Sequence, residues 1–374
     1  MTVSLRPFLL LKFLGTGLVA LLVLPLLFSG AVEAGICYAE YRTDFCSNDV
    51  PAPTVVDEVI IQNSLLDWVQ YAYLEDFANI YPEPSLAVEP LRNVGEGFLY
   101  VTHQGYFFNE AGEKWYVINP GEYTPGENVR EVEISEFTGR QLHEQPPRPF
   151  GWILAAVTPS RIPGEEPDEA FPRLERYTFF EVHDAVVDDE DWIWYYIGGD
   201  RWVRQTFVSL IDVKPRPEGV GPNEFWTEVD LYEQSFAAYV GDRMVYASVI
   251  STGLNWWPTR EGLFQVWDRW EEAKMSGAEG KIDYYFIEDV PHTMYFDLEM
   301  EIALHGAFWH DRFGYKHSHG CVNMPPRVAE WVYYWSEMAP NDLWVWVHTS
   351  DPYHYFEIYK DGHIATVDDS VNMD

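Results

Sequence analysis

A cysteine with histidines near it in the chain is the residue group best suited to chemistry in this sequence. Cys321 stands in the run Ser318-His319-Gly320-Cys321-Val322-Asn323, and His305, followed by Gly306, lies 16 positions before it. A free thiol titrates near about 8.5 and attacks a carbonyl as a thiolate, so it needs a base or a positive environment. His305 and His319 are the imidazoles available for that role. Gly320 permits a tight turn, in which its N–H can approach an oxyanion.

The flanking pattern predicts the elements that position these residues. Met300–Leu304 reads as an apolar strand that ends at His305. Met324-Pro325-Pro326 reads as a helix start, and the apolar residues that follow recur at helical spacing. Cys321 is therefore expected just before a helix N-terminus, where outward-pointing backbone N–H groups would lower the pKa of its thiol.

These residues resemble the L,D-transpeptidase (YkuD-type) family. Its pattern is His-Gly, a short loop, then Ser/Thr-His-Gly-Cys-hydrophobic-Asn or Arg, and the match is complete at those positions. Further similarity is found at Asp230, Gln234, Val245–Gly253, Pro258-Thr259 and Gly262. The resemblance covers roughly Phe225 to Thr349, about a third of the chain.

The resemblance implies a cysteine-dependent L,D-transpeptidase that cross-links or remodels peptidoglycan, without a cofactor or a metal. Cys321 would attack the carbonyl of the third stem residue, a diamino acid, and expel the terminal D-alanine. The resulting thioester would pass to an amine of a neighbouring stem, a free D-amino acid, an anchored protein or water. His305 matches the general base, oriented by the backbone of Gly306. His319, Gly320 and Cys321 would line the oxyanion hole, with His319 counted among the catalytic residues, and Ser318 and Asn323 match supporting positions.

Two other functions remain open. A zinc-dependent wall peptidase would use His317 and His319 with His305 or His310. Against it, no Asp or Glu stands at a ligand-like spacing within Lys316–Val322. A non-catalytic wall-binding protein would use the aromatic-rich N-terminal half instead.

Two aromatic residues are candidates for the substrate groove. Tyr295 and Phe296 could line it, although aromatic residues at strand positions also fill cores.

The chain is predicted to be mainly β, with several segments. A helix is expected over Asn63 to Tyr81, with Leu66, Val69, Tyr73 and Phe77 on one face. Trp192–Ile211 resembles bacterial SH3-like modules, and a generic β-rich spacer is the alternative. The predicted segments are 1–34, a signal peptide or membrane anchor; 35–95, an N-terminal segment with the helix; 96–213, a β-rich and SH3-like domain; 214–223, a linker; 224–350, a β-sandwich-like catalytic domain with one prominent helix; and 351–374, a C-terminal tail.

The N-terminal residues and the charge bear on location and partners. Arg6 and Lys12, the apolar run Phe13–Phe28, and small residues ending at Ala34 are typical of a secretory signal. An uncleaved membrane anchor is the alternative, and either places the protein outside the cytoplasm, at the cell wall, the periplasm or the surface facing the outer membrane. Cys37 and Cys46 can pair in an oxidising compartment, which leaves Cys321 as the odd thiol. A net charge of −36 with 24 Lys plus Arg excludes a nucleic-acid-binding surface.

Overall fold

The structure is a computed structural model and describes residues 56–57, 64–277 and 284–351. The expected signal or anchor, the Cys37–Cys46 pair and the tail beyond Asp351 lie outside the described residues. Among the helices that are described, none is long and apolar enough to cross a membrane.

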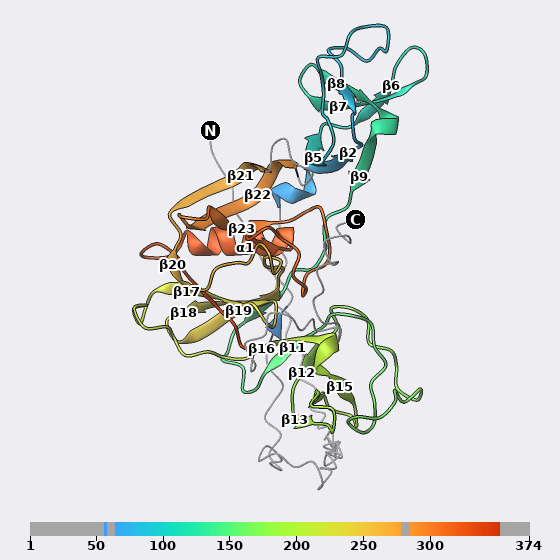
Figure 1. Ribbon diagram of the computed structural model, residues 1–374. Coiled ribbons are helices and arrows are strands. Elements are labelled where there is room, and N and C mark those ends of the chain that lie inside the picture. The colour runs from blue at the N-terminus through green and yellow to red at the C-terminus, as the bar shows by residue number, and fades with distance from the viewer. Residues whose placement is uncertain (1–55, 58–63, 278–283, 352–374) are drawn as a thin grey trace, which may run out of the picture. The chain divides into compact units, whose positions relative to one another are not determined.

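Strands dominate the described residues, and α1 (Pro326–Ser336) is the one α-helix among them, so the predicted fold class is confirmed (Figure 1). The first large sheet has the order β1-β10-β19-β18-β17-β25-β20. Its strands are β1 (Val56–Asp57), β10 (Arg140–Leu142), β19 (Arg243–Val249), β18 (Ser235–Val240), β17 (Phe225–Asp230), β25 (Trp344–His348) and β20 (Gly262–Gln265).

The second large sheet has the order β24-β23-β22-β5-β2-β9, and β21 also pairs with β22. These strands are β24 (Val322–Met324), β23 (Ile302–Gly306), β22 (Tyr285–Asp297), β5 (Phe98–His103), β2 (Gln70–Leu74), β9 (Val129–Val132) and β21 (Asp268–Gly277). This sheet joins strands from both ends of the described chain.

Small sheets and 3-10 turns complete the described structure. The small sheets contain β12 (Phe179–Glu181), β11 (Phe150–Ile153) and β16 (Val208–Ile211); β13 (Asp184–Val187), β14 (Ile193–Tyr196) and β15 (Trp202–Arg204); β6 (Tyr106–Phe108), β7 (Lys114–Asn119) and β8 (Glu122–Pro125); and β3 (Asn79–Ile80) and β4 (Arg92–Asn93). The turns are η2 (Leu65–Asp67), η3 (Gly126–Asn128) and η4 (Gln205–Phe207).

Within residues 224–350, turns and the helix start lie where glycine and proline residues favour them. The chain turns from β18 through Gly241, whose φ of +59° suits a tight hairpin into β19. Pro326 occupies the first turn of α1, where a missing N–H costs nothing. The buried face of α1, with Val328 and Val332, packs on β22 and β23. One core therefore lies between the first sheet, β22–β24 and α1.

The helix predicted over Asn63 to Tyr81 is wrong. Residues Gln70–Leu74 form β2, which pairs with β5 on one side and β9 on the other. Phe77, expected on the apolar face, is 61% exposed and has a φ of +59°. Strand pairing with distant partners, together with aromatic residues that favour a pleated surface, outweighed the local helical spacing.

The boundaries upstream of the catalytic part also differ from the prediction. Residues 70–132 form β2, β5 and β9 with the β6-β7-β8 sheet, whereas β10 joins the first large sheet through β19. The region 96–213 is thus divided between different sheets, and an SH3-like fold within it stays a prediction. The expected linker packs closely: Val220 is 3% exposed and lies in a core with Trp226 and Tyr239.

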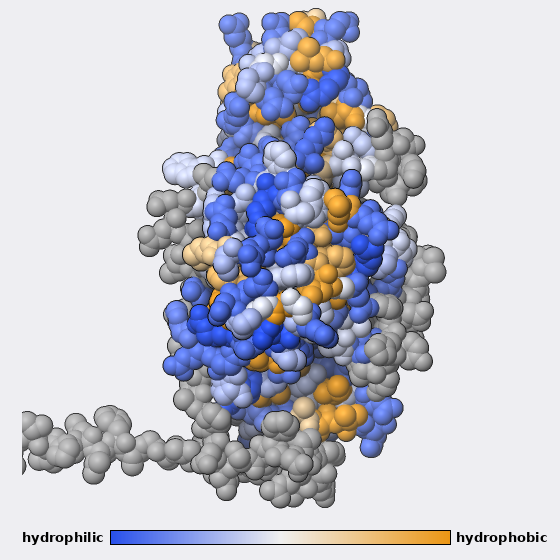
Figure 2. All heavy atoms as spheres, turned by 90° about the vertical axis from the view of Figure 1, so that its left-hand side faces the viewer, coloured by the Kyte–Doolittle hydropathy of each residue, from blue (hydrophilic) through white to orange (hydrophobic). Residues whose placement is uncertain are grey.

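The surface reflects the acidic composition. Figure 2 shows one face of the molecule, on which hydrophilic side chains predominate and apolar ones gather in small groups. A strongly charged surface of this kind keeps proteins soluble.

Candidate active site

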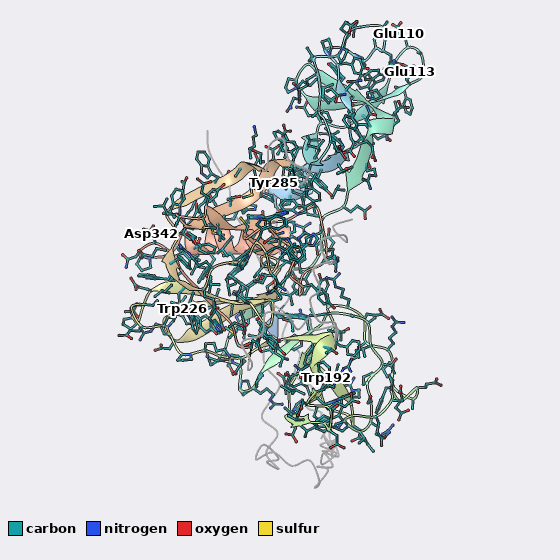
Figure 3. All side chains as sticks on the ribbon, viewed as in Figure 1. Glu110, Glu113, Trp192, Trp226, Tyr285 and Asp342 are labelled. Carbon is teal, nitrogen blue, oxygen red and sulfur yellow. The ribbon has the colours of Figure 1, made fainter. Side chains whose placement is uncertain are left out.

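Parallel pairing of β23 with β24 brings the two halves of the motif together. His305 on β23 is in register with Asn323 on β24, and Leu304 is in register with Val322. Cys321 directly precedes β24 and is partly buried. Cys321, His305 and Asn323 all line one cleft of about 500 Å³, together with His317, Ser318 and His319. Tyr285, labelled in Figure 3, lines the same cleft from the start of β22.

The turn before Cys321 is held by its own hydroxyl and by a neighbouring threonine. Ser318 Oγ accepts a hydrogen bond from Gly320 N–H at 3.1 Å and donates to the carbonyl of Cys321. Thr259 Oγ1 donates to the Gly320 carbonyl at 2.7 Å and accepts from Gly253 N–H at 2.9 Å. Gly320 has a φ of +125°, which other residues rarely adopt. Hydrogen bonds therefore hold this turn at Ser318 and at Gly320.

The sequence predicted that the Gly320 N–H lines the oxyanion hole, but this N–H already donates a hydrogen bond within the turn. It donates to Ser318 Oγ, so it is not directed at a reacting oxygen in this structure. Ser318 thus acts as a support for the turn.

The segment Ser251-Thr252-Gly253, which follows β19, supports this turn through backbone hydrogen bonds. The Thr252 carbonyl accepts from the N–H groups of His317 and Ser318 at 2.9 and 3.1 Å. Ser251 and Asn323 exchange two backbone hydrogen bonds, both 2.8 Å. Gln234 holds Thr252 in turn, because its amide accepts from Thr252 N–H at 2.8 Å and donates to Thr252 Oγ1 at 2.6 Å. Gln234 and Thr252, which the sequence pattern singled out, are therefore positioning residues.

The expectation of a lowered thiol pKa is wrong. Three residues of β24 and Pro325 separate Cys321 from α1, so the sulfur does not lie at a helix N-terminus. Burial raises the pKa of the Cys321 thiol to about 11, and a backbone hydrogen bond from Ala303 opposes this only in part. At neutral pH the resting sulfur is a thiol.

His305 is a buried, neutral imidazole. Burial lowers the pKa of His305 to about 4, and the hydrogen bond to Gly306 works against that shift. Its Nδ1 lies 3.1 Å from the Gly306 carbonyl. Since a carbonyl only accepts, Nδ1 carries the hydrogen and Nε2 keeps a lone pair. A Cβ at Gly306 would lie 2.8 Å from Pro291 Cγ, so this position has room for glycine alone.

Asn323 connects the motif to a second pair of histidines. Its side-chain amide lies 3.0 Å from His310 Nε2, and His310 Nδ1 accepts from Arg312 N–H at 3.1 Å. The Asn323 atom at this distance is Nδ2. Because a neutral imidazole accepts at only one ring nitrogen, the hydrogen bond from Arg312 N–H to Nδ1 is kept when the Asn323 amide is turned so that its oxygen faces Nε2–H. The ring of His310 also lies 4.0 Å from that of His317. Burial lowers the pKa of both histidines, to about 4 for His317.

His319 lies at the exposed edge of the cleft. Its ring is 4.2 Å from that of Trp257 and 5.8 Å from that of Tyr285. His319 is thus exposed, whereas His305 is buried.

Neither of the two groove candidates is among the residues that line this cleft. Phe296 is 3% exposed and packs against Phe264 in the core, because it faces away from the cleft on β22. Tyr295 is half-buried and close to Cys321: after burial, the charge of that sulfur is the next contribution that raises the pKa of Tyr295.

Sequence reasoning missed several cleft residues. Trp309 and Tyr285 line the cleft, as do Tyr73, Tyr100 and Arg130 from the N-terminal strands. No local pattern marks them, since their position depends on pairing between β5 and β22.

One group in the described structure has the spacing of a metal site. It consists of Glu228, Asp230 and His348, whose ligand atoms lie within 4.8 Å of one another. The histidines of the zinc hypothesis are not part of it. His348 Nε2 lies 2.8 Å from Glu228 Oε1, an arrangement that an ion pair also explains.

Comparison with known proteins supports the resemblance. Residues 224–362 match the family model of the YkuD L,D-transpeptidase catalytic domain. The crystal structure of an Enterococcus faecium L,D-transpeptidase mutant is 27% identical over 33% of this chain and 50% of that chain, with a TM-score of 0.30. The catalytic domain of the E. faecium enzyme is 27% identical over 34% of this chain and 98% of that one, with a TM-score of 0.29. An L,D-transpeptidase from Mycobacterium smegmatis is 18% identical over 59% of this chain and 89% of that chain, with a TM-score of 0.31.

The extent of these matches differs between proteins. The chain spans about half the length of the first two solved structures that it matches. No curated protein matches the chain significantly.

Proposed function

We propose that this chain, which carries the L,D-transpeptidase catalytic domain in residues 224–362, transfers peptidoglycan stem peptides through a thioester on Cys321. The observation that carries the proposal is the pairing of β23 with β24. It places a thiol and an imidazole with an unprotonated Nε2 in one cleft.

The pKa directions define the order of events in this mechanism. A thiol with a pKa of about 11 and an imidazole with a pKa of about 4 do not exchange a proton at rest. The Sγ proton therefore passes to His305 Nε2 as sulfur bonds to the carbonyl carbon of the third stem residue. The tetrahedral adduct then collapses: its bond to the D-alanine nitrogen breaks, and His305 returns the proton to that leaving amine. An acceptor amine attacks the thioester and regenerates the Cys321 thiol.

The developing oxyanion needs donors other than Gly320. Because the Gly320 N–H is held by Ser318, the other N–H groups of the turn take this role, first that of Cys321 itself. Loss of one such donor typically costs about 10²–10³ in rate.

The location follows from the N-terminal pattern. Residues 1–34 have the basic, apolar and small-residue order of an export signal, which agrees with a substrate outside the cytoplasmic membrane. Cross-linking there would act on the cell wall and hence on cell shape.

The decisive experiment measures D-alanine release from a stem tetrapeptide by the full chain. Cys321→Ala should abolish release, His305→Gln should lower it by about 10²–10⁴, and a chelator should leave it unchanged. Full activity of Cys321→Ala together with loss in chelator would overturn the proposal in favour of a zinc peptidase.

A further inference from the structure

The strands at residues 70–132, here called the N-terminal module, build one wall of the catalytic cleft. β5 pairs in parallel with β22, with Phe98 opposite Tyr285 and Tyr100 opposite Ile287. Phe98 N–H also donates to the Tyr284 carbonyl at 3.0 Å. The module is thus continuous with the strand beside Cys321, and its side chains share the cleft with the nucleophile.

Aromatic rings run from this wall to the catalytic base. The centroids of Tyr73 and Tyr100 are 5.3 Å apart, and those of Tyr100 and Trp309 are 6.4 Å apart. Trp309 lies 5.6 Å from the imidazole of His305. A substrate bound at Cys321 can therefore extend along ring faces onto the module.

The outer end of this aromatic path already holds a cation. The guanidinium of Arg130 lies 4.3 Å from the centroid of Tyr73, and its Nε is 2.8 Å from Glu75 Oε1. The ring face is therefore suited to a positive group. Because Glu75 balances the charge of Arg130, other carboxylates set the charge of this wall.

Those carboxylates are Asp76 and Glu96, which line the cleft beside Gly97. Asp76 Oδ1 accepts from Gly97 N–H at 3.1 Å, which fixes its position. After burial, the charge of Asp76 is the next contribution that raises the pKa of Tyr73, so this carboxylate lies close to the ring. Two acidic groups beside aromatic faces form a setting for an ammonium group.

We propose that Asp76 and Glu96, with the aromatic wall of the N-terminal module, form a subsite for a primary ammonium group of the substrate. On the proposed function, on which this inference rests, that group is the side-chain amine of the diamino acid in the stem. The module is then a specificity element of the enzyme.

The test must separate position from charge, because the chain carries 60 Asp plus Glu. Binding is measured by calorimetry on full-length protein with Cys321→Ala, so that no reaction occurs. The probes are the tetrapeptide L-Ala–γ-D-Glu–L-Lys–D-Ala and the same peptide acetylated on the lysine amine. The test variant adds Asp76→Asn and Glu96→Gln.

The matched control adds Glu110→Gln and Glu113→Gln instead. Both residues are exposed on the same module, at its far end from Tyr285 (Figure 3). The control removes the same charge from the same module without touching the cleft.

The expected pattern is specific to the free amine. Acetylation should weaken binding to the Cys321→Ala protein and to the control about three- to tenfold, because Asp76 and Glu96 are exposed and two exposed ion pairs contribute on this scale. The test variant should bind the free peptide as weakly as the Cys321→Ala protein binds the acetylated one. Acetylation should not weaken binding to the test variant further.

Other patterns overturn the inference. One is that the Cys321→Ala protein binds both peptides equally or binds neither. The other is that the control loses as much affinity for the free peptide as the test variant does. Release of D-alanine by wild-type protein is followed in parallel. If the wild-type protein releases D-alanine but Asp76→Asn/Glu96→Gln does not change peptide binding, the subsite is rejected and the proposed function is kept. If the free peptide binds more tightly than the acetylated one but the wild-type protein releases no D-alanine, the proposed function alone is rejected.

Discussion

At the scale of single residues, burial sets the resting protonation state of the Cys321 thiol. Proximity of a cysteine to histidines in sequence suggests a pre-formed thiolate, but the surroundings of Cys321 favour the neutral form. On the proposed function, the proton would therefore leave the sulfur during attack, and the hydrogen bond to the Gly306 carbonyl leaves the lone pair on His305 Nε2.

This difference predicts how Cys321 responds to an alkylating reagent. Because its pKa is raised to about 11, the thiolate fraction and the alkylation rate should rise about tenfold per pH unit, without a plateau, up to about pH 10. The rate is followed by mass spectrometry of the peptide that contains Cys321. The same peptide in urea-unfolded protein should level off near about pH 9 and serves as the control. A plateau below about pH 8 in the folded protein would indicate a resting thiolate–imidazolium pair instead.

At the scale of elements, the junction of β5 with β22 decides which residues line the cleft. The two strands are far apart in the chain, and Phe98 pairs with Tyr285 across it. The junction is tight at Gly97, which has a φ of +152° and where a Cβ would lie 2.7 Å from the Tyr284 carbonyl oxygen.

Gly97→Ala should therefore destabilise the protein more than a glycine replacement in open space. Gly112 is the matched control, because it has a φ of +79° and nothing within 4 Å of its Cβ position. Gly112→Ala should cost the backbone strain alone, about 1–2 kcal/mol, and Gly97→Ala about 1–3 kcal/mol more through the clash. Urea unfolding measures both, and equal losses would show that the junction yields without cost.

At the scale of the whole molecule, buried neutral histidines link stability to pH. His292 and His305 are each 2% exposed, and burial lowers the pKa of both to about 4. In the unfolded chain these groups titrate near about 6.5, so the unfolded state binds more protons between those values. Stability should therefore fall as the pH falls from about 6.5 to about 4, by roughly 1.4 kcal/mol per pH unit for each histidine.

His292→Asn tests this link away from the nucleophile. His292 has a φ of +54°, a conformation that asparagine tolerates, and it lies beside Tyr333 and Tyr334. The variant should flatten the dependence of unfolding free energy on pH by about 1.4 kcal/mol per unit. His143→Asn, at an exposed position, should leave the slope as it is in wild type. An unchanged slope in His292→Asn would assign the pH dependence to other groups.

The sequence by itself indicated Cys321 as the proposed nucleophile, His305 as the proposed base and the turn before the cysteine, because these depend on residue types within a short segment. The strand that carries His305 and the helix α1 were also predictable, since hydrophobic spacing and proline or glycine punctuation are local signals. The strand β24 after Cys321 was not, because the helix was expected to follow the cysteine directly. Tertiary structure alone decided the raised pKa of Cys321, the core position of Phe296, the strand at Gln70–Leu74 and the module wall of the cleft. Each of these depends on which residues from distant strands pack beside the residue concerned. Local hydrophobic spacing does not record such burial and strand pairing.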